Sequence, residues 1–170
     1  MTLAPASAVR RALFVATLLA ASSSPAFAQE GTPAKPLLET LVEMGDYSAL
    51  IAALNKAGLT EELKGAGPYT IYAPSNSAFE RIPADTLAAL TADPARFKRV
   101  IAHHVLPTKT TGIDMMNMPI YTRVPTQAGD SMTVYHDKGG IKVDLSLVKT
   151  VDVVATNGVI HTVHKVILVK

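Results

Sequence analysis

The sequence contains no cysteine and no tryptophan, and charged residues make up only 18% of its 170 positions. Without cysteine, disulfide bonds, thiolate metal sites, cysteine nucleophiles and lipid attachment at a cysteine are excluded. The formal net charge of +2 is too small for the basic face with which proteins hold nucleic acid. The chain length suits one domain with its own core, and 48% of the residues are hydrophobic. We therefore expect a small domain that is stabilised by packing alone.

The first 28 residues have the layout of a secretory signal peptide. Arg10 and Arg11 precede the apolar run 12–21, and the segment ends with Ala26-Phe27-Ala28, which suits a cleavage site. The run is shorter than the roughly 20 apolar residues that span a membrane. We expect cleavage after Ala28 and a secreted or periplasmic product without a stable membrane span. Residues 29–170 then carry fourteen basic and fourteen acidic residues and are formally neutral.

The remaining chain is predicted to contain a flexible leader and one domain. Residues 29–36 include Gly31 and two prolines among polar residues, so the leader ends where the domain begins, at residue 37. Apolar residues recur at helical spacing from residue 38 to 54, and the pair Gly45-Asp46 is predicted to end one helix and cap the next. Further helices are predicted at 60–63, after Ser75 or Asn76, and at 85–90 and 94–102.

The second half of the chain has the composition of strands. Aromatic and β-branched residues gather in short runs between turn residues, and Asp137-Lys138-Gly139-Gly140 suits a hairpin. Helices in the first half and strands in the second predict an α+β fold, because a parallel sheet requires the two to alternate. The predicted strands are 69–73, 120–124, 132–136, 141–145, 151–155 and 159–169.

Two segments resemble the paired signatures of the fasciclin domain family. Residues 70–79 (TIYAPSNSAF) are similar to the first, and residues 155–168 (ATNGVIHTVHKVIL) to the second. Between them, His104-Val105-Leu106-Pro107 resembles the family's Tyr-His segment, although His103 stands in place of the tyrosine. The resemblance extends over about 37–169 and is closest to secreted bacterial single-domain members. It implies a β-wedge of mostly antiparallel strands, packed with several helices from the N-terminal half.

The signature residues are interpreted first as structural. Ile71 and Phe79 are expected in the core, and Asn157-Gly158 is expected to supply a backbone conformation that other residues resist. The resemblance implies that His104 is packed and hydrogen-bonded. The full set is Ile71, Pro74, Asn76, Phe79, His104, Asn157, Gly158 and His161.

No motif predicts catalysis, a cofactor or a metal site. His161 and His164 are three residues apart on one predicted strand, so their side chains point to opposite faces. His103 and His104 are adjacent and diverge in the same way. Ser75 lacks the Gly-x-Ser-x-Gly sequence of a nucleophile elbow, and no glycine-rich phosphate loop is present. We therefore expect a protein that is not an enzyme.

Candidate partner-binding residues lie in two segments. Met115, Met116 and Met118 are followed by Tyr121, and flexible methionines often line adaptable apolar surfaces. Binding of cuprous ion by the methionine sulfurs is the alternative. Asp152-Val153 lies just before the Asn-Gly turn, where animal members of the family have an integrin-binding motif. The flanking residues differ from that motif, so integrin binding is not carried over.

The resemblance implies a non-enzymatic cell-adhesion or matrix-interaction module. Its partner would be an extracellular or envelope protein or a polysaccharide, since the neutral domain has no bias toward charged polymers. Because some fasciclin relatives bind carotenoids, carriage of a lipophilic small molecule in a methionine-lined groove is the alternative function.

Overall fold

The computed structural model describes residues 35–169. The predicted signal segment 1–28 and residues 29–34 of the predicted leader lie outside the described residues. Lys35 and Pro36 belong to the fold, because the Thr156 amide donates to the Lys35 carbonyl (2.9 Å) and the Thr40 amide to the Pro36 carbonyl (3.0 Å). Within this described part, no helix combines the length and the apolar content needed to cross a membrane.

Helices dominate the first half of the chain and strands the second, which confirms the predicted α+β class. The helices are α1 (Leu37–Glu43), α2 (Ser48–Ala57), α3 (Thr60–Leu63), α4 (Asn76–Glu80), α5 (Ala84–Ala92), α6 (Pro94–His103) and α7 (Gly112–Asn117). The strands are β1 (Tyr69–Pro74), β2 (Val105–Leu106), β3 (Thr122–Pro125), β4 (Ser131–Asp137), β5 (Gly140–Val143), β6 (Ser146–Ala155) and β7 (Gly158–Val163).

The strands form one mixed sheet in the order β2-β1-β7-β6-β5-β4-β3. Every pairing is antiparallel except β1 with β7, which run parallel from Tyr69↔Gly158 to Pro74↔Val163. Strand β6 pairs with β7 as far as Ala155, but it pairs with β5 only through Ser146 and Leu147. The first residues of β6 therefore join the two halves of the sheet.

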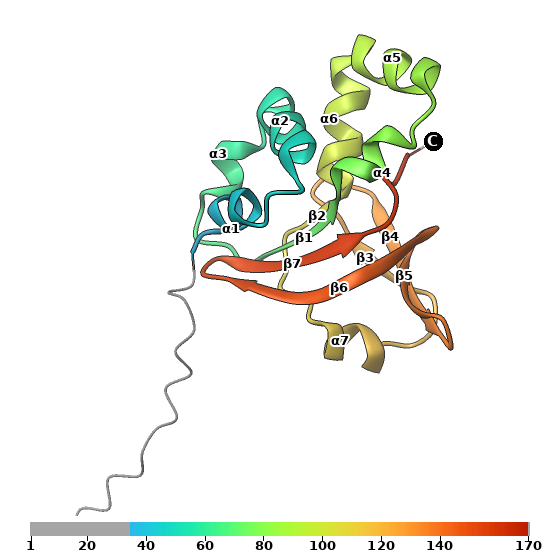
Figure 1. Cartoon of the computed structure of the whole chain (residues 1–170). Coiled ribbons are helices and arrows are strands. Elements are labelled where there is room, and N and C mark those ends of the chain that lie inside the picture. The colour runs from blue at the N-terminus through green and yellow to red at the C-terminus, as the bar shows by residue number, and fades with distance from the viewer. Residues whose placement is uncertain (1–34, 170) are drawn as a thin grey trace, which may run out of the picture. The chain divides into compact units, whose positions relative to one another are not determined.

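The core is divided by the β1–β7 pair. One cluster lies between this pair and helices α1, α2, α3, α5 and α6, and it includes Leu41, Leu54 and Ile101. The second cluster lies among the strands and the inner side of α7, and it includes Tyr72, Met115 and Met132. Figure 1 shows α1–α6 on one side of the β6–β7 hairpin and α7 on the other.

Several sequence predictions about strands are wrong at their ends, and β6 begins at Ser146 instead of residue 151. Strand β7 ends at Val163 instead of residue 169, because the Ile167 amide turns inward and donates to His104 Nε2 (3.0 Å). Strand β5 ends before Leu145, since Asp144 has a left-handed φ of 49°. Helix α7 was not predicted, and β3 begins only at Thr122.

The predicted cap of α2 is also wrong, because Asp46 does not cap it. The side chain of Asn76, from the start of α4, accepts hydrogen bonds from the Ala49 amide (2.9 Å) and the Ser48 hydroxyl (3.2 Å). In return, the backbone amide of Asn76 donates to the Asp46 carbonyl (2.9 Å). Asn76, a signature residue distant from α2 in the sequence, thus supplies the acceptor that the residue just before a helix usually provides at its N-terminus.

Candidate functional site

Helix α7 is fixed at its start by a capping box. The Thr111 hydroxyl accepts from the Asp114 amide (3.2 Å), and the Asp114 carboxylate accepts from the Thr111 amide (2.8 Å). The carboxylate also accepts from the Thr111 hydroxyl (2.7 Å), and the bonds from the Thr111 amide and hydroxyl lower the pKa of Asp114. The carboxylate also suits the positive end of the helix. The short helix therefore has a defined beginning although only six residues form it.

The inner side of α7 packs into the strand cluster. Met115 is fully buried, and its sulfur accepts a hydrogen bond from the Tyr72 hydroxyl at 3.2 Å. The Gly112 amide donates to the Asp152 carboxylate at 2.8 Å. A Cβ at Gly112 would lie 2.8 Å from the other Asp152 oxygen and 3.2 Å from the Val151 side chain, so a larger residue there would require these side chains to shift. The structure thus brings together the methionine segment and Asp152, which are far apart in the sequence.

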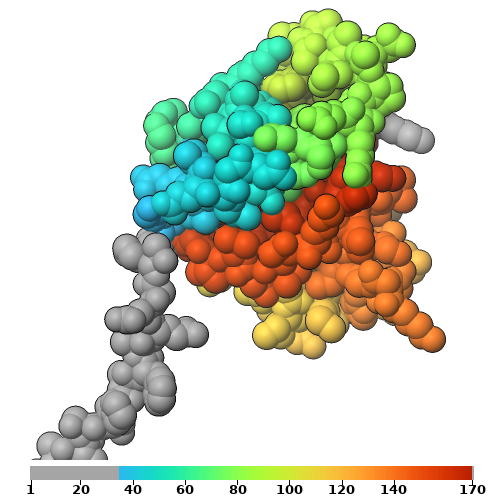
Figure 2. All heavy atoms as spheres, viewed as in Figure 1, coloured from blue at the N-terminus to red at the C-terminus, as the bar shows by residue number. Residues whose placement is uncertain are grey.

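The outer side of α7 and the loop after it present apolar side chains to solvent. The α7 surface, as we name it, consists of Ile113 (70% exposed), Met116 (62%), Ile120 (60%) and Tyr121 (68%). Tyr121 has a left-handed φ of 66°, and its ring stacks on Tyr135 with 5.3 Å between centroids. In Figure 2, α7 forms the yellow projection below the orange strands.

The other predicted partner-binding residues have different environments. Met115 is a core residue and not part of the α7 surface. Met118 is half-buried against the strand cluster, and Val153 is half-buried against the helix cluster opposite Ile160 of β7. The Asp152 carboxylate already accepts a hydrogen bond from the Gly112 amide. Only Met116 and Tyr121 of the six predicted residues are largely exposed.

The signature residues hold separate elements together. Asn157 is buried: its side chain accepts from the Leu37 amide (2.9 Å) and donates to the Leu63 carbonyl (2.8 Å). Ile71 and Pro74 are buried in β1, whereas Phe79 is only half-buried. Gly158 does not have a positive φ, contrary to the expectation, but a Cβ there would lie 2.1 Å from the Tyr69 carbonyl oxygen.

Two buried histidines, His104 and His161, are neutral and link separate segments of the chain by hydrogen bonds. His104 donates from Nδ1 to the Val100 carbonyl (2.8 Å) and accepts at Nε2 from the Ile167 amide. Burial lowers its pKa to about 4. His161 donates from Nε2 to the Thr110 carbonyl (2.7 Å) and accepts at Nδ1 from the Asp152 amide (3.2 Å). Burial also lowers the pKa of His161. Each ring uses one donor and one acceptor, as a neutral imidazole can.

His103 forms a bridge that the sequence did not predict. Its side chain is 5% exposed, with Nδ1 at 2.6 Å from an Asp130 oxygen and Nε2 at 3.0 Å from an Asp144 oxygen. Carboxylates only accept, so both ring nitrogens donate and the ring is charged. Burial alone would lower the pKa of His103, but the bonds to Asp144 and Asp130 raise it above its ordinary value. The one sequence signal was the histidine in the family's tyrosine position.

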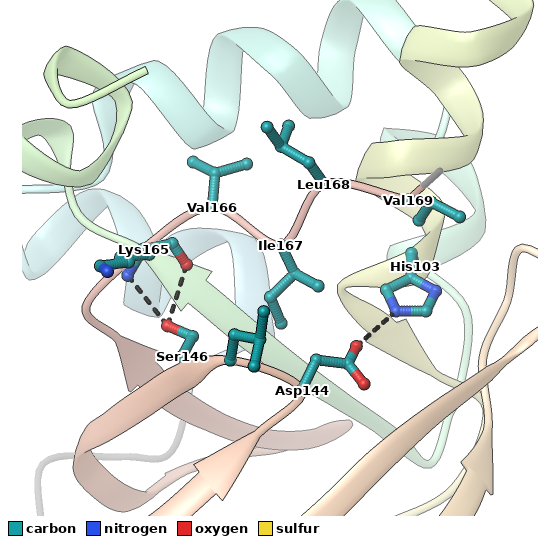
Figure 3. A pocket seen from close by; sticks show the side chains of 9 residues that line it. His103, Asp144, Ser146, Lys165, Val166, Ile167, Leu168 and Val169 are labelled. Atoms are coloured by element: carbon teal, nitrogen blue, oxygen red, sulfur yellow. Dashed lines mark hydrogen bonds and ion pairs between the residues drawn. The ribbon is translucent and has the colours of Figure 1, made fainter. Parts of the chain in front are cut away.

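An apolar pocket of about 380 Å³ lies beside this bridge, lined by residues 144–146, residues 165–169 and His103. Figure 3 shows the His103–Asp144 pair at one side and the chain from Val166 to Val169 along the other. Ser146 Oγ accepts from the Lys165 amide (2.9 Å) and donates to the Lys165 carbonyl (3.1 Å), so its hydroxyl is used within the chain. The bridge joins α6 to the two loops that carry Asp130 and Asp144.

Residues 35–169 contain no group of three or more His, Asp or Glu side chains placed to hold a metal ion. The two histidines of each sequence pair lie in different environments. His103 and His104 bond to different partners, and His164 lies beyond the end of β7, next to Arg81. Desolvation lowers the pKa of His164, and the positive charge of Arg81 lowers it further.

Comparison with known proteins agrees with the topology. The model of the Fasciclin domain family matches residues 45–169. Protein sll1483 of Synechocystis sp. is 36% identical over 76% of this chain and 73% of that protein. Transforming growth factor-beta-induced protein ig-h3 of Sus scrofa is 30% identical over 77% of this chain, which spans only 19% of the pig protein. Immunogenic protein MPB70 of Mycobacterium bovis is 26% identical over 71% of this chain.

A solved structure has the same fold. It is a FAS1 domain pair from the insect cell adhesion molecule fasciclin I, with a TM-score of 0.54 and 19% identity, and the match covers 74% of this chain and 46% of that one. The mixed sheet, the helices on one side of the β1–β7 pair and the interlocked signature residues define a FAS1-type α+β domain. The chain belongs to the fasciclin domain family.

Proposed function

We propose that this protein is a secreted, non-enzymatic cell-adhesion or matrix-interaction module that binds an extracellular or envelope protein or a polysaccharide through the α7 surface. The observation that carries the proposal is that α7 has apolar side chains on both faces. Gly112 and Met115 face the core, while Ile113 and Met116, one position further along, face solvent. A helix that only covers a core has a polar outer face.

The construction of the surface supports a binding role. Aromatic residues and methionine are enriched at the centres of interfaces, and Tyr121 is already ordered by stacking on Tyr135. The Asp152 carboxylate and the capping box fix the helix start, so little conformational entropy is lost on binding. The domain pair of known structure comes from a cell adhesion molecule, which supports the same class of function.

The experiment measures binding of the purified, labelled protein to envelope fragments of its native host. Tyr121→Ala and Met116→Ala remove exposed side chains and are expected to weaken binding about tenfold or more each, as for interface hot spots. Val42→Ala on α1, also 61% exposed, is the matched control and should bind like the wild type.

Equal binding by all three variants would contradict the proposal. Circular dichroism spectra of the variants show that the fold is intact in each case. Protease treatment of the envelope fragments separates the two partner classes, because it abolishes binding to a protein and leaves binding to a polysaccharide.

Carriage of a lipophilic molecule such as a carotenoid is a second candidate. The pocket of about 380 Å³ supports it, since ligand pockets are mostly apolar and of a few hundred Å³. The methionines do not support it, because Met115 and Met132 are core residues. Protein purified from its native host should then show visible absorption or co-purifying lipid in mass spectra. A colourless, lipid-free preparation would exclude this function.

A further inference from the structure

The hydrogen bonds of the two residues that flank Leu145 fix its side chain in a solvent-exposed position. Its side chain is 90% exposed, more than that of any other large hydrophobic residue in the described part of the chain. On one side, the Asp144 carboxylate bonds to His103 and accepts from the Thr133 amide (2.9 Å), and the Asp144 amide donates to the Thr133 carbonyl (2.8 Å). On the other side, buried Ser146 is bonded to Lys165. The position of Leu145 therefore follows from the structure around it.

The turn at Leu145 adds almost no burial to the isolated chain. Asp144 adopts a left-handed φ of 49°, a conformation that aspartate tolerates better than most residues other than glycine. The turn is thus well defined, but the leucine that follows Asp144 is left in solvent. An ordered turn that presents an apolar tip suits a contact with a second apolar surface.

The pocket lies directly beside this tip, since Leu145 itself forms part of its lining. Leu168 continues the apolar surface and is 43% exposed, and Ile167 lies buried below it. A dry apolar cavity of about 150 Å³ already holds benzene. A pocket of about 380 Å³ therefore has room for a leucine side chain.

We propose that this face docks a second copy of the chain, with Leu145 of each copy entering the pocket of the other. A projection next to a matching pocket on one surface is what a two-fold interface requires, because the same patch serves both partners. Of the charged residues in the lining, His103 and Asp144 pair with each other within one copy, and Lys165 is the remaining one. With a formal charge of only +2 for the whole chain, net repulsion between two copies is small.

This surface shares no residue with the α7 surface, so the two proposals can fail separately. A leucine and a lipophilic ligand would occupy the same space, and the two uses of the pocket exclude each other. The cross-link below is therefore measured on lipid-free protein.

The first test exploits the absence of native cysteine. Tagged Leu145→Cys protein is mixed with untagged Leu168→Cys protein under mild oxidation, and the reducible heterodimer is measured on a non-reducing gel. We expect at least ten times more heterodimer than in the control mixture of Ile113→Cys with Leu168→Cys, in which a residue of the α7 surface replaces Leu145. Equal yields from the two mixtures would overturn the proposal.

The second test is sedimentation equilibrium of the wild type and of single-substitution variants without introduced cysteines. The wild type should show a concentration-dependent dimer, and Leu145→Asp should raise its dissociation constant at least tenfold, because a carboxylate cannot enter an apolar pocket without losing hydration. Ile113→Asp, with a native-like circular dichroism spectrum, should leave the constant unchanged. A wild type that stays monomeric up to millimolar concentration, or an equal effect of both substitutions, refutes docking at this face.

Discussion

At the scale of single residues, several side chains act on elements far from their own position in the sequence. Asn76 accepts from α2, Asn157 joins α1 to the turn after α3, and Asp152 holds the start of α7. Each supplies a backbone amide or carbonyl at a helix end with the partner it lacks. The side chains of Asn76 and Asn157 therefore satisfy main-chain groups at helix ends.

Replacement of Asn76 by alanine tests this role. Asn76→Ala leaves the Ala49 amide without its acceptor and should lower the free energy of unfolding by about 1 kcal/mol, the usual effect of losing a helix cap. Urea denaturation measures the change.

Ser75→Ala is the matched control, because the Ser75 hydroxyl bonds only to that of Ser77. Its effect should stay below about 0.5 kcal/mol. Asn76→Asp keeps the acceptor and should recover most of the lost stability. If Ser75→Ala and Asn76→Ala cost the same, Asn76 is not the cap.

At the scale of elements, the parallel pair β1–β7 determines where everything else lies. Both strands are almost completely buried, and the two core clusters lie on opposite sides of them. Their pairing begins where the Tyr69 amide donates to the Asn157 carbonyl at 3.0 Å and Gly158 lies against Tyr69. The Asn-Gly pair is therefore needed for close approach of two strands as well as for the turn.

Gly158→Ala should be strongly destabilising. The new Cβ would lie 2.1 Å from the Tyr69 carbonyl oxygen and 2.9 Å from Leu37, and neither the paired backbone nor the core can move aside easily. We expect a loss of about 3 kcal/mol or more in the free energy of unfolding.

Gly129→Ala provides the comparison. Gly129 has a φ of 82° but nothing within 4 Å of a Cβ, so only backbone strain of about 1 kcal/mol is expected. Thermal denaturation of both variants measures the difference. Equal melting temperatures would show that the contact with Tyr69 does not determine the stability of the strand pair.

At the scale of the whole molecule, the buried histidines make stability depend on pH in two directions. His104 and His161 have folded pKa values below the ordinary value, so they bind protons more tightly when unfolded. Their effect is that stability falls as the pH drops below about 6.5. His103 has a raised folded pKa, so its contribution is complete below about 6.5 and is lost as the pH rises through the folded value.

We therefore expect maximal stability near neutral pH. Between pH 6.5 and the folded pKa of His104 at about 4, this residue alone should remove about 3 kcal/mol. Urea midpoints across pH 4–9 measure the curve. His104→Gln should flatten the acid limb, and His103→Gln should flatten the alkaline limb. An acid limb that is unchanged in His104→Gln would contradict the assignment.

Periodicity, turn residues and signatures are local properties, so the order of the amino acids was enough to predict the α+β class, the approximate position of most helices and strands, and membership of the fasciclin family. Which candidate residues are exposed and which are buried became visible only in the folded chain. Met115 and Met116 are neighbours in the sequence, yet one lies in the core and the other in solvent. The His103 bridge and the Leu145 pocket combine segments up to 66 residues apart, between His103 and Val169. Such contacts form only when the chain packs, since no local pattern encodes which distant carboxylate or carbonyl a buried side chain will meet.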